Sequence, residues 1–596
     1  AMHRINGLLQ AGDFRTAHEQ LEIIVDGNPG FPEARRLLAG AKLALGDAGG
    51  AERILRVAAA AEPAWPPTLT MLGELLLGSG RHEEAEQFLL QAATDRQADP
   101  RAALVLARRC NDTQRHAQAL AVAAPFCSLA DVAPELAAQH VAALVALGRG
   151  EEAIAFYRRL VTDSPGNATL HALAIALQAA NRHDEAERTA RRVLARGPGT
   201  AALCYTHARS LIALGAFDRA EMALNDCLRL EPQHAEAHND LARLIWMRTG
   251  DAGQSTATLD EVLRKFANNH ALRAAKAAVL QGAGDPRAAY ACLAARVERP
   301  QAPPALLVRA GLAALEFDPG IALELAQRAL RAVPADSAAR KLMVAALLGI
   351  GGARAALPLC ETLLNEEPDD QYLLALQTTT WRLLGDASYE RVCDYRNLVV
   401  PYRLEAPAPW RDLAEFLADV KRSLEKLHAA HRHPLLFQSL RHGTETTEDL
   451  ARSSDPAIRA LFTEFDAPIR DYMARIGRGS DPLRRRNNGT YSFNGSWSVR
   501  LRSRGFHQNH VHPRGWISSA CYIELPDEPA DARAGNLTFA EPGVITSPVL
   551  HAEHGVRPEP GMLVLFPSYF WHGTVPFGGE RTRLTVAFDA VPGPRS

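Results

Sequence analysis

The chain has 596 residues, of which 47% are apolar and 22% are charged, and its formal net charge is −2. At roughly 100–200 residues per domain, this length predicts three or more folding units. The near-neutral charge argues against nucleic acid and anionic membrane surfaces as partners, because both favour a strong basic field. The eight scattered cysteines include no CxxC pair, which favours reduced thiols and a cytoplasmic location. No apolar run reaches the roughly 18 residues of a membrane-spanning helix.

A short pattern recurs through the first two thirds of the chain: a turn residue, then alanine five places later. Four copies are GDFRTA at Gly12, GRHEEA at Gly80, GRGEEA at Gly148 and GAFDRA at Gly215. Neighbouring copies start 33 or 34 residues apart, except for one interval of 69 that spans a degenerate copy near Gly250. This period, with a turn glycine and a small alanine at a helix contact, resembles the tetratricopeptide repeat (TPR). We predict an all-α TPR superhelix, or solenoid, over residues 2–390, with about ten to eleven repeats.

The repeat period stops near Gly385, and residues 399–410 are proline-rich and extended, as expected of a boundary. Residues 412–431 have the periodicity of one amphipathic helix. Residues 456–476 predict further helix that breaks just before Pro468. Residues 433–450, between these helices, are interpreted as a polar loop. We assign residues 391–480 to a linker and bracing helices.

From Tyr491 onward, short runs of β-forming residues are separated by Pro, Gly and Asp. The predicted strands are YSFNGSWSVRL (491–501), ISSACYIELP (517–526), GNLTFAE (535–541), GMLVLFP (561–567) and RLTVAFDAV (583–591). Many short strands in one region favour a sandwich or jelly roll. Residues 481–596 are therefore predicted to form a β-domain, with the preceding helices bracing one sheet.

One stretch, FHQNHVHPRGW (506–516), holds three histidines within six positions. Alternate residues of a strand share a face, so His510 and His512 are placed to bind one ion, whereas His507 has the opposite parity. Two imidazoles form a chelate but not a complete site. His572, in FPSYFWHGTVPF, offers a third ligand 60 residues after His512.

Eleven residues after His572, Arg583 starts the last predicted strand, and Thr585 shares its face. This order of residues resembles the double-stranded β-helix dioxygenases that use Fe(II) and 2-oxoglutarate, and most closely those that carry N-terminal TPRs. The segments HVHPRGWISSACYIELP, FPSYFWHGTVPF and RLTVAFD carry the resemblance, which covers about residues 395–593. It implies an α+β double-stranded β-helix, a jelly-roll or cupin-like fold, for residues 481–596.

The resemblance also implies roles for individual residues. His510, His512 and His572 would be the metal ligands and would leave open positions for bidentate 2-oxoglutarate and O2. Arg583 would bind the far carboxylate of 2-oxoglutarate with its planar, permanently charged fork, and Thr585 would add a hydroxyl donor. Tyr522 is a further candidate donor to this cosubstrate.

The sequence departs from the family pattern at His512, where Asp or Glu is usual. Three neutral imidazoles also suit zinc, so the choice between iron and another metal stays open. His507 or Glu541 could complete the metal face in place of His512.

We therefore expect a dioxygenase, acting as a hydroxylase, that uses Fe(II), 2-oxoglutarate and O2 on a side chain of a peptide or protein. TPR arrays commonly bind such a partner along their concave face. Three alternatives remain open: a TPR scaffold with an inactive oxygenase-like domain, a small-molecule hydroxylase, and a three-histidine metalloenzyme that does not use 2-oxoglutarate. The oligomeric state, a homodimer included, is also left open.

Overall fold

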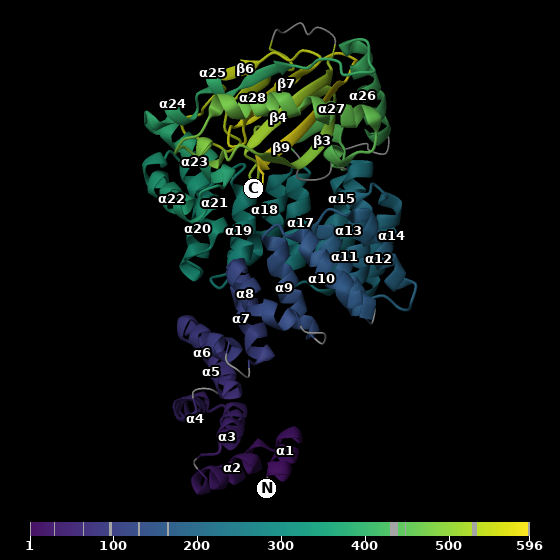
Figure 1. Cartoon of the computed structure of the whole chain (residues 1–596). Helices are drawn as coiled ribbons and strands as arrows, with labels where there is room; N and C mark the ends of the chain where they lie inside the picture. The colour runs from purple at the N-terminus through teal and green to yellow at the C-terminus, as the bar shows by residue number, and fades with distance from the viewer. Residues whose placement is uncertain are drawn as a thin grey trace. The chain divides into compact units, whose positions relative to one another are not determined.

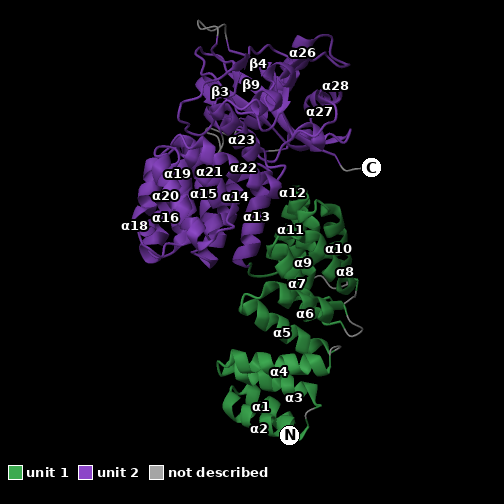
Figure 2. Ribbon diagram, turned by 90° about the vertical axis from the view of Figure 1, so that its left-hand side faces the viewer, with its two compact units in different colours: residues 1–199 green, residues 200–596 purple. Residues whose placement is uncertain are grey.

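The computed structural model describes residues 2–28, 30–62, 65–94, 98–128, 132–163, 166–428, 439–447, 449–526 and 533–593. The chain divides into two compact units, Ala1–Gly199 and Thr200–Ser596, drawn in green and purple in Figure 2. This division falls inside the repeats, so the domain boundaries expected near residues 390 and 480 stay predictions. Within the described ranges, no helix is long and apolar enough to cross a membrane.

The first unit is helical throughout its described residues. Its helices are α1 (Met2–Gln10), α2 (Phe14–Gly27), α3 (Pro32–Ala44), α4 (Ala48–Ala61), α5 (Pro66–Gly78), α6 (His82–Thr94), α7 (Pro100–Asp112), α8 (His116–Cys127), α9 (Pro134–Ala146), α10 (Gly150–Asp163), α11 (Asn167–Ala179) and α12 (His183–Leu194). Sequential helices pack against each other as hairpins, which is the packing expected of TPRs.

The second unit continues the repeats and then changes character. Its repeat helices are α13 (Ala201–Ala213), α14 (Phe217–Leu230), α15 (Ala235–Thr249), α16 (Ala252–Lys265), α17 (His270–Gly282), α18 (Pro286–Val297), α19 (Pro304–Ala314), α20 (Pro319–Ala332), α21 (Ser337–Gly349), α22 (Ala353–Glu366) and α23 (Gln371–Leu384). They are followed by α24 (Ser388–Val392), α25 (Tyr395–Leu398), α26 (Leu413–His428), α27 (Pro456–Glu464) and α28 (Asp466–Ile476).

The recurring sequence pattern has a direct structural meaning in both units. The turn residues adopt the left-handed conformation, with φ between 57° and 91°, at Gly12, Gly46, Gly80, Gln114, Gly148, Asn181, Gly215, Gly284 and Gly351. The alanine five places later has no exposed surface at Ala17, Ala51, Ala85, Ala119, Ala153, Ala186, Ala220, Ala289 and Ala356. Ala322 is equally buried, although Phe317, five places before it, is not left-handed. The degenerate copy keeps both features, because Gly250 has φ 65° and Ser255 is fully buried. Only a small side chain fits this helix contact.

The C-terminal strands form two antiparallel sheets, seen in yellow and green in Figure 1. The strands are β1 (Val400–Arg403), β2 (Leu440–Glu445), β3 (Tyr491–His507), β4 (Ile517–Glu524), β5 (Leu537–Phe539), β6 (His554–Val556), β7 (Met562–Pro567), β8 (His572–Thr574) and β9 (Arg583–Pro592). The larger sheet has the order β1-β7-β4-β9-β3-β2, and the smaller one has the order β6-β5-β8. Phe539 of β5 contacts Phe566 of β7 at 5.0 Å between ring centroids, so the sheets pack face to face. The predicted α+β jelly-roll-like fold is confirmed.

Helices α26, α27 and α28 cover the other face of the larger sheet (Figure 1). Phe416 of α26 and Phe465, between α27 and α28, belong to the same buried core as Phe588 of β9. The helix predicted over residues 456–476 does break ahead of Pro468, at Phe465. The helix predicted over residues 412–431 is seen to His428, and residues 429–431 lie outside the described ranges.

The polar-loop interpretation of residues 433–450 is wrong where the structure describes them. Residues 440–445 form β2, which pairs with β3 through an irregular register between Arg441 and Gly443. His442 has φ 56° at this irregularity, and a bulge of this kind hides the alternating pattern of a strand. Residues 433–438 and 448 lie outside the described ranges.

The last repeats share a buried core with the loops of the β-domain. Val511 and Trp571 pack among side chains of α21, α22 and α23. The Trp571 indole Nε1 donates a hydrogen bond to Thr379 Oγ1 at 2.9 Å. Arg382 of α23 donates to the carbonyl oxygens of Ala540 and His551, each at 2.8 Å. The repeats therefore support segments adjacent to the predicted metal ligands.

Candidate metal centre

The three predicted ligands, His510, His512 and His572, lie together in the second unit. One ligand nitrogen from each lies within 4.8 Å of the other two. His572 starts β8, and its backbone exchanges hydrogen bonds with His510 at 3.0 and 3.1 Å. The strand expected across residues 510–512 is not formed, because His510 makes only this isolated bridge. The ligands converge through the bridge and through a hydrogen bond from His512 N to Ser568 O at 3.1 Å.

Each imidazole is held through its Nδ1 atom. Nδ1 of His510 lies 2.8 Å from Gln508 O, and Nδ1 of His572 lies 2.9 Å from Phe570 O. Nδ1 of His512 lies 2.8 Å from Asp589 Oδ2. Because all three partners are acceptors, each Nδ1 carries the proton, and each Nε2 keeps its lone pair for a metal.

The protein environment favours the neutral form of His510 and His572. Burial lowers the pKa of His510 to about 3 and holds the pKa of His572 well below its ordinary value. Neighbouring imidazoles lower both pKa values further. Since metal ions bind neutral imidazole, the cluster is prepared for a metal at neutral pH.

Asp589 is a site residue that the sequence reasoning missed. Its Oδ2 faces His512, while its Oδ1 accepts a hydrogen bond from Ser518 Oγ at 2.7 Å. It supplies a carboxylate next to the histidine that stands where the family usually has Asp or Glu. A signal was present in the sequence, because Arg583, Thr585 and Asp589 share one face of β9.

We expect Asp589→Asn to weaken metal binding by about 10- to 100-fold, the usual cost of losing the carboxylate partner of a metal-binding histidine. The variant keeps the volume of the side chain but loses the charge that fixes the His512 tautomer. The measurement is a competition titration against a chelator. Glu580→Gln, which removes an exposed carboxylate, is the control, and equal affinities in the two variants would contradict this role.

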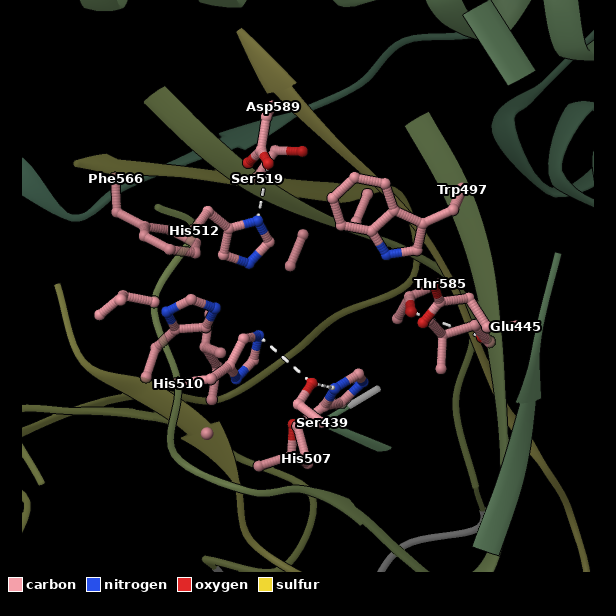
Figure 3. A pocket seen from close by; sticks show the side chains of 18 of the residues that line it. Ser439, Glu445, Trp497, His507, His510, His512, Ser519, Phe566, Thr585 and Asp589 are labelled. Atoms are coloured by element: carbon pink, nitrogen blue, oxygen red, sulfur yellow. Dashed lines mark hydrogen bonds and ion pairs between the residues drawn. The ribbon is translucent and has the colours of Figure 1, made fainter. Parts of the chain in front are cut away.

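A cavity of about 510 Å³ joins the histidines to Arg583 and Thr585 on β9. Figure 3 shows His510 and His512 on one side of it, with Trp497 and Thr585 facing them. The ring of Trp497, on β3, stacks on His512 at 5.6 Å between centroids. Phe566 and Leu537 add apolar wall, so the cavity can exclude bulk water from a bound ion.

Arg583 is a buried cation without a counter-ion among the residues that the structure describes. Its side chain is 3% exposed, and its Nη1 donates to Gly535 O at 3.1 Å. Its Nε has no hydrogen-bond partner among the described residues, and no carboxylate of those residues forms an ion pair with it. Burial lowers the pKa of Arg583. A buried, unpaired guanidinium is costly unless an anion binds it, so this end of the cavity suits a carboxylate ligand.

Tyr522 lies beside Arg583 rather than on the cavity wall. Its ring centroid is 5.0 Å from the guanidinium carbon, and its hydroxyl has no hydrogen-bond partner in the described part of the chain. The hydroxyl influences the pKa of Arg583 without reaching good hydrogen-bond geometry. The direct contact of Tyr522 with a cosubstrate therefore stays a prediction.

The two alternative ligands are placed differently. Nδ1 of His507 lies 2.9 Å from Ser439 Oγ, which also lies 3.3 Å from His510 Nε2. Glu541 lines an adjoining groove. Neither belongs to the three-histidine group, which is the single group of this kind among the described residues. The geometry therefore favours His512 as the third ligand, although the assignment stays a prediction.

Fold and site together define a helical-repeat protein whose C-terminal β-domain carries a three-histidine cluster. Residues 495–589 match the family model described as "Putative 2OG-Fe(II) oxygenase". Residues 8–68, 46–109 and 144–206 match one tetratricopeptide repeat model, and residues 205–270 match another. The chain thus has TPRs in its N-terminal region and a domain of this oxygenase family at residues 495–589.

Solved structures that resemble the chain are TPR proteins. Yeast Tom70 has 13% identity and a TM-score of 0.36, and the match covers 66% of this chain and 96% of Tom70. A TPR protein from Parabacteroides merdae has 14% identity and a TM-score of 0.31, with coverage of 41% and 97%. The C-terminal part of a TPR protein from Cytophaga hutchinsonii has 14% identity and a TM-score of 0.32, with coverage of 40% and 99%. No curated protein matches the chain.

Proposed function

We propose that this protein is an Fe(II)- and 2-oxoglutarate-dependent dioxygenase that hydroxylates a side chain of a peptide or protein recruited by its repeats. The observation that carries the proposal is one shared cavity. It holds the three histidine side chains at one end, and at the other the guanidinium of Arg583, which forms no ion pair with the described residues. A metal needs the first group of residues, and a cosubstrate with a free carboxylate needs the second.

The residues present fit both groups. His510, His512 and His572 would hold the metal through Nε2, and Asp589 would offset part of its charge through His512. Arg583 would bind the far carboxylate of 2-oxoglutarate in bidentate fashion. When bound, Fe(II) with 2-oxoglutarate and O2 supplies oxidative decarboxylation to succinate and CO2, coupled to hydroxylation of a substrate C–H bond.

The other residues of the cavity would orient the reactants and keep water out. Trp497 fixes the plane of the His512 ring by stacking on it. Phe566 packs against His572 at 4.7 Å between ring centroids. A ring orientation that is fixed before the metal binds reduces the reorganisation needed on binding.

A peptide or protein substrate is favoured by the setting of the site. TPRs generally bind other proteins, and a groove of about 1060 Å³ adjoins the cavity. A groove of this size lies at the upper end of the range for ligand pockets. All three histidines of the cluster are present, and each has a hydrogen-bond partner on Nδ1, which argues against an inactive scaffold.

A cytoplasmic, reducing compartment is supported by the eight cysteines, all of which are free.

The test is oxygen transfer to peptides. The full chain is incubated with Fe(II), 2-oxoglutarate, O2 and a tryptic digest of cellular protein, and peptides are screened for a mass gain of one oxygen atom. We expect such peptides only when 2-oxoglutarate is present and none with His572→Ala. Succinate production without any oxidised peptide would contradict the peptide substrate. A metabolite extract assayed in parallel would then identify a small-molecule substrate.

A further inference from the structure

The groove beside the metal cavity is built from both the repeats and the β-domain of the second unit. Residues of α17, α19 and α23 line it, as do loops of the β-domain. The groove and the cavity share several lining residues, namely Ser439, His507, His510, Val511, Pro513 and Thr574. A chain lying in the groove therefore passes the position of the metal.

Arg309, on α19, is the unexplained polar group of this groove. Its Nε and Nη2 atoms are buried and have no hydrogen-bond partner within the described residues. These two nitrogens form one edge of the guanidinium, whose parallel N–H groups match the two oxygens of a carboxylate. Leaving such donors buried and unsatisfied costs free energy, so this edge is suited to an incoming ligand.

The charged side chains that line the groove are balanced in sign. Arg441 of β2 also lines the groove and donates to Gln508 Oε1 at 2.6 Å. Burial lowers the pKa of both arginines, and Glu316 is the carboxylate whose charge opposes this effect in each case. Glu316 is exposed and accepts a hydrogen bond from Gln281. Arg309 and Arg441 are matched in number by Glu316 and Glu541 among the groove's lining residues, so the groove has no excess positive charge, and the unsatisfied edge of Arg309 is what favours a carboxylate.

The rest of the groove suits a peptide backbone. Gln281 and Asn509 present side-chain amides, which can both donate and accept. Tyr372 and Trp571 pack edge to face at 6.1 Å between ring centroids and form an apolar part of the wall. Amides beside apolar rings are typical of sites that bind extended peptides.

We infer that Arg309 is a specificity determinant that binds the side-chain carboxylate of an Asp or Glu residue in the peptide substrate. This inference rests on the proposed function, because it assumes that a peptide lies in the groove beside the metal. It assigns the substrate class as acidic peptides, with the acidic residue at a fixed separation from the hydroxylated residue.

The test compares two peptide libraries on the full chain. One is a random library, and the other has the same sequences with Asp and Glu replaced by Asn and Gln. We expect the wild-type protein to retain acidic peptides roughly 10- to 100-fold better than their amide counterparts. This is the difference in affinity expected from one bidentate hydrogen bond between charged groups. Arg309→Gln should remove this preference, and Arg309→Lys should restore only part of it, because lysine has no fork.

Controls make the result specific. Arg331→Gln removes an exposed arginine of α20 and should keep the wild-type preference. Thermal unfolding of Arg309→Gln checks that the variant is folded. Equal retention of both libraries by the wild-type protein, or an unchanged preference in folded Arg309→Gln, would overturn the inference.

The proposed function is tested separately on the wild-type protein, by adding Fe(II) and 2-oxoglutarate without peptide. If the cosubstrate binds but the acidic preference is absent, only the role of Arg309 fails. If the cosubstrate does not bind, the proposed function fails, and the inference that depends on it fails too.

Discussion

Replacing Arg583 with alanine is expected to weaken 2-oxoglutarate binding by at least about 30-fold while metal affinity changes little. Removing one partner of a buried charge pair costs about 2–5 kcal/mol, and about 1.4 kcal/mol corresponds to a tenfold change in affinity. Arg583 is a buried cation of the cavity that forms no ion pair with the described residues, and the metal ligands make no hydrogen bond to it. The measurements are two separate titrations, one with metal and one with 2-oxoglutarate on the metal-loaded protein.

Two further results make this prediction specific. Arg583→Lys keeps the charge but loses the planar fork, so its 2-oxoglutarate affinity should fall between those of the wild type and Arg583→Ala. Without ligand, Arg583→Ala should unfold at the wild-type temperature or above it, because the change removes a buried, uncompensated charge. An equal loss of metal and 2-oxoglutarate binding would count against the assigned role.

Replacing His572 with alanine is expected to reduce metal affinity by at least about 100-fold. Loss of a residue that only hydrogen-bonds to a metal ligand costs up to about 100-fold, and loss of a ligand itself should cost no less. Only His510 and His512 would remain of the three converging nitrogens. The fold should survive, because His572 pairs with His510 through backbone atoms that alanine retains. Metal content and thermal unfolding, measured on the same preparation, separate these two effects.

The matched control is His551→Ala. His551 is exposed and lies outside the three-histidine group, and its contact with Arg382 uses the carbonyl oxygen, which alanine retains. This variant should bind metal as the wild type does. Retention of full metal affinity by His572→Ala would mean that the metal, if any, is bound elsewhere.

The repeats were predictable because each copy contains the same local structure. A turn residue in the left-handed conformation and a small buried residue five places later can be read from sequence spacing. Even Ser255, in the degenerate copy, occupies the buried position. The long strands were also predictable, since β4, β7 and β9 are runs rich in β-forming residues, most of which are buried.

The strands that were missed are short or irregular. β1 contains Pro401, which a sheet tolerates at an edge, and β1 lies at an edge of the larger sheet. β6 has only three residues, which is too short to show alternation. In both cases pairing with a distant strand, rather than local preference, determines the structure.

The residues of the site also fall into a group that could be predicted from sequence and a group that could not. The spacing of His510, His512, His572 and Arg583 made their grouping predictable. By contrast, the contacts of Ser439 with His507 and His510, and the role inferred for Arg309, depend on segments far apart in the chain that meet only in the folded second unit. Two buried, unsatisfied nitrogens on a half-buried arginine cannot be recognised from a repeat sequence, because arginine is usually solvated there.

The most direct measurement is an anaerobic visible absorption titration of the full chain, first with Fe(II) and then with 2-oxoglutarate. A charge-transfer band from chelated 2-oxoglutarate should appear in the wild type, be absent in His572→Ala, and require far more 2-oxoglutarate in Arg583→Ala. Bound metal without a band at saturating 2-oxoglutarate would contradict the dioxygenase proposal and would favour a zinc site or a binding role for the repeats alone.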